Sequence, residues 1–216
     1  HVNKSVNEAG NELTLEAYLT NEVTQTVSTK LLDIVLVLDQ SGSMADLFGN
    51  VTRQAAMKNA VNAFIEEVAA ENADHRMAIV TFGSGAEELV RGWTTVDDSG
   101  KTTLTNAING LPITPKGATN VGEGMQEAEK LMNSATDTAT DRQKVVIVFT
   151  DGVPTTTNEF STDVANTAIT AAKNMKNSGV TIYTVGIFNG ADPDELYGKD
   201  KIGFWGHNDG ECKGRS

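Results

Sequence analysis

Cysteine is almost absent from this chain of 216 residues, which contains Cys212 and no other cysteine. A single thiol cannot form a disulfide within the chain, and it cannot build a cysteine-based metal site. A low cysteine content fits the cytosol, and it also fits a bacterial exterior where disulfides are optional. A fold held together by disulfides is therefore excluded.

Basic residues are also in short supply. Lys and Arg number 17 against 29 Asp and Glu, so the net charge is −12 and the pI is about 4.6. No basic face can be assembled to neutralise phosphates, which disfavours nucleic acid as a partner. Docking on anionic lipid is disfavoured for the same reason. The acidic surface would concentrate cations near a carboxylate site, although most of this charge serves solubility.

Several sequence signatures are missing as well. No stretch of about 18 apolar residues appears, so we expect no direct insertion into a membrane. The sequence has no Gly-x-x-x-x-Gly-Lys loop and no Gly-x-Gly-x-x-Gly after a strand, which are the phosphate-binding signatures of nucleotide sites. It also lacks the Gly-x-Ser-x-Gly elbow of serine hydrolases. These absences remove the most common nucleotide-dependent and hydrolytic enzyme classes.

What is present centres on one apolar run, Ile34 to Leu38, which is typical of a strand buried on both faces. The run ends at Asp39, and hydroxyls follow at Ser41 and Ser43. These oxygens are hard donors, which suit Mg²⁺, Mn²⁺ or Ca²⁺ better than Zn²⁺ or Cu²⁺. One carboxylate and two hydroxyls cannot neutralise a divalent ion, so a metal held here would still attract another anion.

Strand and helix signals alternate along the rest of the chain. We expect strands at Ile34–Leu38, Met77–Phe82, Leu89–Trp93, Val145–Phe149 and Val180–Ile187. We expect helices at Thr52–Glu71, at Thr102–Asn109, from just after Thr119 to about Asn133, and at Thr162–Lys176. In the last helix we expect an inward face of Ala165, Ala168, Ile169, Ala172 and Met175. This order predicts an α/β fold, with a doubly wound, Rossmann-like, mostly parallel sheet and helices on both faces. Ligands of such sheets bind beyond the carboxyl ends of the strands.

The two ends of the chain differ from its middle. Residues 1–30 form a β-like lead-in, because apolar and polar residues alternate from Leu13 to Leu19. Residues 31–188 make up the predicted domain core. Residues 189–216 are a Gly- and Asp-rich tail with no strand signal, so they are either the start of an insertion or the end of a shortened domain.

The motif Asp39-x-Ser41-x-Ser43 at a strand end resembles the metal-ion-dependent adhesion site of von Willebrand factor A (vWA) domains and integrin I domains. That family completes its site with a Thr and an Asp from two later loops. Thr119 in Gly-Ala-Thr-Asn and Asp151 in Val-Phe-Thr-Asp-Gly match them. The resemblance implies that the three hydroxyls contact the ion directly, and that the two aspartates act largely through water.

The sequences around this motif look most like vWA domains of Gram-positive pilus-tip and cell-wall adhesins. The resemblance implies a non-enzymatic, cation-dependent adhesion module on the cell surface, part of a larger surface protein. Its partner would be a host or extracellular-matrix protein that offers an acidic residue to the metal. We expect Gln40, Met44, Asn120, Val153 and Pro154 to supply short-range contacts.

Two alternatives stay open. The first is an intracellular vWA domain that assembles a multiprotein complex, as in metal-chelatase subunits. The second is a Mg²⁺-dependent phosphatase of the haloacid dehalogenase type, although Ser41 stands where that chemistry needs a second Asp as general acid.

Three smaller expectations concern single residues. We expect Asp46 to be a solvated loop carboxylate rather than a ligand of a second cation. We expect His1, His75 and His207 to be surface residues with no role, and Trp93 to pack at the sheet edge.

Overall fold

The computed structural model describes residues 2–6, 13–17, 30–135, 142–157 and 159–187. Its strands are β1 (Val2–Val6), β2 (Leu13–Ala17), β3 (Leu32–Asp39), β4 (Leu47–Phe48), β5 (Val51–Thr52), β6 (Arg76–Phe82), β7 (Ala86–Thr95), β8 (Gln143–Thr150) and β9 (Thr181–Gly186). Its helices are α1 (Arg53–Ala70), α2 (Asp98–Gly110), α3 (Val121–Ser134) and α4 (Thr162–Asn177), with a short 3₁₀ helix, η1, at Gly42–Ala45.

A five-stranded sheet with the order β7-β6-β3-β8-β9 forms the middle of the domain. β3 lies at its centre and pairs in parallel with β6 on one side and with β8 on the other. β7 is the antiparallel edge strand, joined to β6 by a tight turn. The prediction of a mostly parallel sheet with Ile34–Leu38 as a central strand is therefore confirmed.

The register of the parallel strands brings their carboxyl ends to one edge. Leu38 of β3 lies opposite Thr81 of β6 and Phe149 of β8. The residues that follow these strands therefore leave the sheet side by side, and Asp39 and Asp151 belong to neighbouring loops. This edge is where an open α/β sheet binds its ligands.

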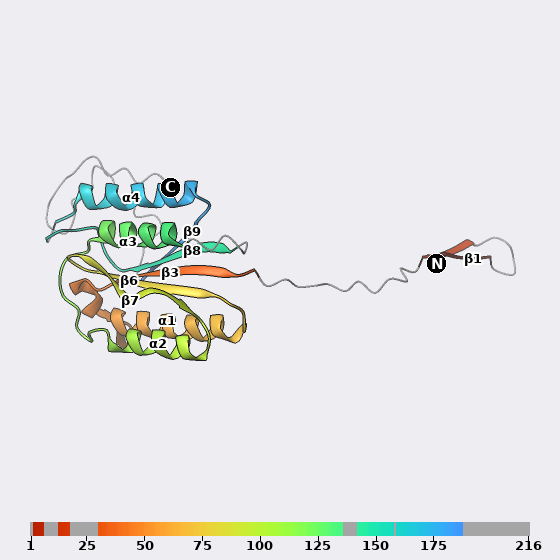
Figure 1. Cartoon of the computed structure of the whole chain (residues 1–216), viewed down its shortest axis with the longest axis horizontal. Coiled ribbons are helices and arrows are strands. Elements are labelled where there is room, and N and C mark those ends of the chain that lie inside the picture. Colours follow the sequence, from red (N-terminus) through yellow and green to blue (C-terminus); the bar gives the residue numbers. More distant parts are fainter. Residues whose placement is uncertain (1, 7–12, 18–29, 136–141, 158, 188–216) are drawn as a thin grey trace.

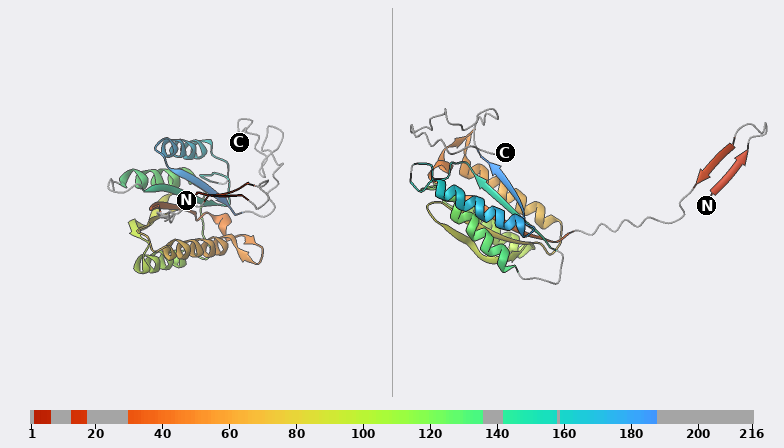
Figure 2. Two further views of the ribbon diagram at one scale, coloured as in Figure 1. Left: turned by 90° about the vertical axis from the view of Figure 1, so that its right-hand side faces the viewer. Right: turned by 90° about the horizontal axis from the view of Figure 1, so that it is seen from above.

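Helices cover both faces of the sheet, α1 and α2 on one side and α3 and α4 on the other (Figures 1 and 2). The central strand divides its side chains between two cores: Ile34, Leu36 and Leu38 join the α1–α2 side, whereas Val35 and Val37 join the α3–α4 side. All five are essentially fully buried, as an unbroken apolar run predicts. Among the described residues, no helix is both long and apolar enough to cross a membrane.

Side-chain caps set where the helices begin. α2 starts at Asp98, four residues before the predicted Thr102, because the Asp97 side chain accepts a hydrogen bond from the Gly100 N–H at 2.7 Å. Such a cap satisfies one of the free N–H groups of a first helical turn. The apolar pattern from which the helix was predicted begins only later, at Leu104.

The inward face of α4 matches the predicted one at Met175, and at Ala168 and Ala172, which pack against the core, but it differs at Ile169. Ile169 was expected in the core, but it is 60% exposed, and the buried side chains of the helix are Val164, Ala171 and Met175. α4 packs closely on α3 at this face, since a Cβ atom at Gly122 would come within 2.8 Å of the Val164 carbonyl oxygen. This close approach decides which stripe of the helix is buried, and the spacing of apolar residues alone does not reveal it.

His75 was expected at the surface and is instead fully buried. Its Nδ1 accepts the Leu32 N–H at 3.1 Å, so Nε2 carries the proton and donates to Glu71 Oε2, also at 3.1 Å. The histidine thus fixes the start of β3, at the opposite end of that strand from Asp39. Trp93 lies in the edge strand β7, as expected, with the Arg76 guanidinium 5.6 Å from its ring centre.

At the beginning of the chain, β1 and β2 pair antiparallel, with Val2 opposite Ala17 and Val6 opposite Leu13. The strand predicted from the alternating pattern at Leu13 is therefore present. The division into residues 1–30, 31–188 and 189–216 stays a prediction. The tail 189–216, with Cys212 and His207, lies outside the described residues, and so does His1.

Candidate metal centre

Three loops meet at the carboxyl edge of the sheet, and together they carry all five predicted site residues. A backbone hydrogen bond from the Gly42 N–H to the Gly117 carbonyl, at 3.0 Å, joins the first two loops. The Asn120 N–H donates to the Gly83 carbonyl of the β6–β7 turn at 2.7 Å, which ties the second loop to the sheet. Thr119 and Thr155 are linked twice, since the Thr119 N–H donates to Thr155 Oγ1 and the Thr155 N–H donates to the Thr119 carbonyl. The loops therefore hold one another in place.

The side chains of the site form a chain of hydrogen bonds. Asp39 Oδ1 accepts the Ser41 N–H at 2.7 Å, which turns the loop back over the end of β3. Ser41 Oγ lies 3.1 Å from Ser43 Oγ, and Ser43 Oγ donates to Asp151 Oδ1 at 2.8 Å. The first and third loops are thus joined through their functional groups.

Thr119 completes the group through its hydroxyl. A Cβ atom built at Gly152 would lie 3.4 Å from Thr119 Oγ1 and 3.6 Å from Ser43 Oγ. Both hydroxyls therefore border the same small space beside Gly152, which a side chain at that position would enter. The structure therefore brings Asp39, Ser41, Ser43, Thr119 and Asp151 together at one edge of the sheet, and their binding of a metal stays a prediction.

The two carboxylates of the site are shielded from water. Asp39 is fully buried, and so is the side chain of Asp151. Burial raises the pKa of Asp39 above its ordinary value, and the nearby negative charge of Asp151 adds to the increase. Hydrogen bonds from Ser41 and from the Thr150 hydroxyl, at 2.7 Å, oppose that increase. Because the two buried carboxylates raise each other's energy when both are charged, a cation near them would be stabilised.

The donor set fits a hard divalent cation. Carboxylate and hydroxyl oxygens are ligands of the Mg²⁺ class, and the space beside Gly152 lies against two of the hydroxyls. No group of three or more His, Cys, Asp or Glu side chains suited to a metal occurs in the described part of the chain. A metal at this edge would therefore depend on Ser and Thr hydroxyls as well as on acids.

Sequence reasoning missed one charged residue of the site, Arg53. Its Nη1 donates to Asp151 Oδ2 at 2.7 Å, to the Ser43 carbonyl at 3.3 Å and to Asp46 Oδ2 at 3.4 Å. Arg53 is the first residue of α1, where a cation opposes the helix dipole and an acid is preferred. This placement favours a compensating carboxylate, but the sequence does not indicate that Asp151, 98 residues away, supplies it.

Two of the five residues expected to contact a partner are inaccessible. Met44 is fully buried in the core beneath the loop, and Asn120 is buried because its side chain caps α3 by accepting the Glu123 N–H. Val153 is 48% exposed, whereas Gln40 exchanges hydrogen bonds with the buried Gln54. Asp46 has a side chain that is 67% exposed, as expected of a solvated carboxylate.

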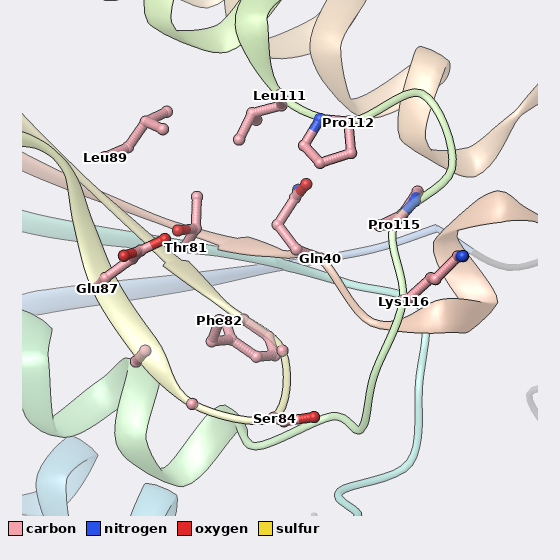
Figure 3. A pocket seen from close by; sticks show the side chains of 13 residues that line it. Gln40, Thr81, Phe82, Ser84, Glu87, Leu89, Leu111, Pro112, Pro115 and Lys116 are labelled. Atoms are coloured by element: carbon pink, nitrogen blue, oxygen red, sulfur yellow. The ribbon is translucent and has the colours of Figure 1, made fainter.

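A cleft of about 440 Å³ opens beside the site (Figure 3). Gln40, which stands between Asp39 and Ser41 in the chain, forms part of its wall together with the Gly83–Gly85 turn. The remaining lining is partly apolar, from Leu89, Leu111, Pro112 and Pro115, and Glu87 and Lys116 stand on opposite sides of it. The cleft thus offers apolar surface between two opposite charges.

A mostly parallel α/β sheet, with a cluster of acids and hydroxyls at its carboxyl edge, is the architecture of a vWA domain. The model of the von Willebrand factor type A domain family matches residues 33–200, and the chain belongs to this family. The resemblance noted in the sequence is therefore confirmed.

Solved structures with a similar fold include two pilus proteins. The pilus adhesin SpaC from Lactobacillus rhamnosus GG has a TM-score of 0.60 and 18% identity, over 86% of this chain and 28% of SpaC. The minor pilin PilB from Streptococcus sanguinis has a TM-score of 0.60 and 17% identity, over 76% of this chain and 52% of PilB.

The conserved hypothetical protein BatB from Bacteroides thetaiotaomicron has a TM-score of 0.56 and 17% identity, over 76% of this chain and 74% of BatB. At these identities the likeness shows the fold. This chain spans about a quarter of SpaC and about half of PilB.

Proposed function

We propose that this protein is a cation-dependent adhesion module, which binds a partner protein through a divalent metal held by Asp39, Ser41, Ser43, Thr119 and Asp151. The observation that carries the proposal is the low charge of the site. It contains two carboxylates, and the charge of one of them, Asp151, is already countered by Arg53 at 2.7 Å. The remaining donors are neutral hydroxyls. Such a set leaves a cation in need of a further anion.

Each residue has a role that follows from its position. Ser41, Ser43 and Thr119 would hold Mg²⁺ directly, with Mn²⁺ or Ca²⁺ as substitutes, and Asp39 and Asp151 would orient these hydroxyls or bound water. The cation would supply an electrophilic centre that accepts a carboxylate oxygen from the partner. Gly152, by lacking a side chain, keeps the approach to Thr119 and Ser43 open.

The surface around the site suits a protein partner. Apolar side chains are exposed on the loops that carry the site or lie next to it, namely Leu47, Phe48, Val51, Ile113 and Val153. Exposed apolar residues that gather near a polar site are typical of interaction surfaces. Because the net charge of −12 opposes an acidic partner at long range, we expect specificity to reside in these short-range contacts and in the cleft.

The pilus proteins that share this fold suggest where the module would act. SpaC is described as a pilus adhesin and PilB as a minor pilin. By analogy of fold, we place this protein outside the cell, on the surface or at a pilus tip of a Gram-positive bacterium. Its partner would be a host or extracellular-matrix protein with an accessible acidic residue.

Binding to a panel of extracellular-matrix proteins tests this proposal. Binding should require Mg²⁺ or Mn²⁺, disappear in EDTA and return when the metal is restored. Thr119→Ala should lower the affinity by at least about tenfold without changing thermal unfolding, because it removes one neutral donor. Thr170→Ala is the matched control, since Thr170 lies exposed on α4 and its hydroxyl donates to the Asn166 carbonyl of the same helix.

Three outcomes would contradict the proposal. Binding that persists in EDTA would remove the metal from the mechanism. Phosphatase turnover that depends on Asp39 would place the protein among enzymes instead. Binding confined to an intracellular assembly partner would favour the scaffold alternative.

A further inference from the structure

The guanidinium of Arg53 shares Asp151 with the rest of the site. Asp151 Oδ1 accepts a hydrogen bond from Ser43 Oγ at 2.8 Å, and Oδ2 accepts one from Arg53 Nη1 at 2.7 Å. The carboxylate therefore turns one oxygen toward the predicted metal ligands and the other toward a fixed positive charge. Because the Asp151 side chain is fully buried, solvent only weakly screens the attraction between Asp151 and Arg53.

Two features oppose the placement of the Arg53 guanidinium at the start of α1. As the first residue of α1 it adds positive charge at the positive end of the helix dipole. Its Nε–H is buried and finds no hydrogen-bond acceptor among the described residues. Its hydrogen bonds to the described residues all come from one nitrogen, Nη1, and the shortest of them is to Asp151. The pairing with Asp151 is thus the main attraction that keeps the guanidinium there.

Arg53 has a second hydrogen-bond acceptor, Asp46, at the edge of the site. Asp46 Oδ2 lies 3.4 Å from the same nitrogen, and the Asp46 side chain is 67% exposed against 19% for Arg53. A small movement of the guanidinium toward Asp46 would exchange a buried acid for a solvated one. Arg53 therefore has two alternative partners, one inside the site and one outside it.

We propose that Arg53 is an internal cation that competes with the divalent metal for Asp151, and that Asp46 receives the guanidinium when the metal binds. This inference rests on the proposed function. Two positive charges on either side of one carboxylate repel each other, so a bound metal favours the arginine position nearer Asp46. In the metal-free protein, Arg53 neutralises a buried acid and keeps the loops together.

The consequence is a threshold for metal binding. Arg53 lowers the affinity of the site for cations, so the site fills only at a higher cation concentration than the bare ligand set would need. Asp46 reduces that penalty by offering the displaced guanidinium another partner. The pair would thereby tune the module to respond to the cation level of its surroundings.

Calorimetric titration of Mn²⁺ alone tests this competition with four proteins: the natural chain, Arg53→Gln, Asp46→Asn and the double variant. Arg53→Gln should bind Mn²⁺ about tenfold more tightly, because one opposing charge is removed. Asp46→Asn should bind severalfold more weakly, and the double variant should match Arg53→Gln. Lys130→Gln on α3 is the control for the loss of one positive charge, and it should leave the affinity unchanged.

The double variant shows whether Asp46 acts by receiving the Arg53 guanidinium or by attracting the metal directly. If Asp46→Asn weakens Mn²⁺ binding equally with and without Arg53, Asp46 acts directly on the metal, and the proposed movement of Arg53 to Asp46 is wrong. If Arg53→Gln binds Mn²⁺ no better than the natural chain, Arg53 only positions Asp151 and the competition is wrong. No Mn²⁺ binding by any of the four proteins would overturn this inference and the proposed metal site together.

Thermal unfolding gives an independent readout. In EDTA, Arg53→Gln should be less stable than the natural chain, because it leaves the buried Asp151 without its counter-charge. Saturating Mn²⁺ should narrow that difference, and Arg53→Lys should behave like the natural chain in both conditions. A difference that stays the same with and without Mn²⁺ would indicate a purely structural role and contradict the inference.

Discussion

Asp39 carries a carboxyl group at a position where its charge costs stability. It sits at the end of the central strand, fully buried, where loss of water penalises its charged form. The Ser41 N–H and the Thr150 hydroxyl, both at 2.7 Å, recover part of that penalty. Burial nevertheless dominates and raises the pKa of Asp39 above its ordinary value. The proposed divalent cation would offset the cost of this buried charge.

We predict that Asp39→Asn stabilises the metal-free protein at neutral pH and abolishes metal binding. Because the folded pKa of Asp39 is raised, the folded chain holds this proton more tightly than the unfolded chain does. Stability from this group is therefore lost as pH rises above the ordinary value of 3.8 and through the folded pKa. Asparagine keeps the acceptor for Ser41 without the charge.

Thermal unfolding in EDTA between pH 4 and pH 7 checks the prediction, with Mn²⁺ calorimetry alongside. The melting temperature of the Asn variant should exceed that of the natural chain at pH 7, and the difference should shrink toward pH 4. A variant that melts below the natural chain at every pH would show that the Asp39 charge stabilises the fold, contrary to this prediction.

At the scale of elements, the position of α3 determines where Thr119 lies. The helix begins immediately after Thr119 and Asn120, and it packs closely on β6 near the end of that strand. Gly124 permits the contact, since a Cβ atom there would lie 2.9 Å from Phe82 Cδ1. Phe82 in turn accepts the Gln40 N–H through its carbonyl at 2.7 Å. One close helix–strand contact therefore aligns two of the three loops.

We predict that Gly124→Ala destabilises the protein by about 1–3 kcal/mol, because the added methyl group overpacks against the Phe82 ring. It should also weaken Mn²⁺ binding by shifting Thr119. Gly110→Ala, at the last position of α2, is the matched control, because nothing lies within 4 Å of its added Cβ. Denaturant unfolding should find the control unchanged or slightly more stable. Equal stability of the two variants would contradict the close packing of α3 on β6.

At the scale of the whole molecule, much of the fold could be predicted from the sequence. The unbroken apolar run Ile34–Leu38 indicated a strand covered on both faces, and it proved to be the centre of the sheet. The alternation of strand and helix signals indicated parallel pairing, and parallel pairing brings strand ends to one edge. The convergence of Asp39 and Asp151 follows from that topology. Thr119 was identified only through the resemblance to the family.

What could not be predicted depends on tertiary contacts. His75 is buried because Leu32 and Glu71 satisfy both of its ring nitrogens, and the contact with Leu32 joins residues that are 43 positions apart in the sequence. Met44 follows the metal motif directly, yet it turns into the core. Arg53 reaches Asp151 across 98 residues of sequence. Polar pairing over such distances leaves no periodic pattern.

The most direct test is the crystal structure of this protein soaked in Mn²⁺, with anomalous diffraction used to locate the ion. The central claim predicts one strong anomalous peak in contact with the hydroxyls of Ser41, Ser43 and Thr119, and Mg²⁺ at the same place should show oxygen distances of about 2.1 Å. One coordination position should be taken by water or by a carboxylate from outside the site. A peak elsewhere, or none at millimolar Mn²⁺, would contradict the claim.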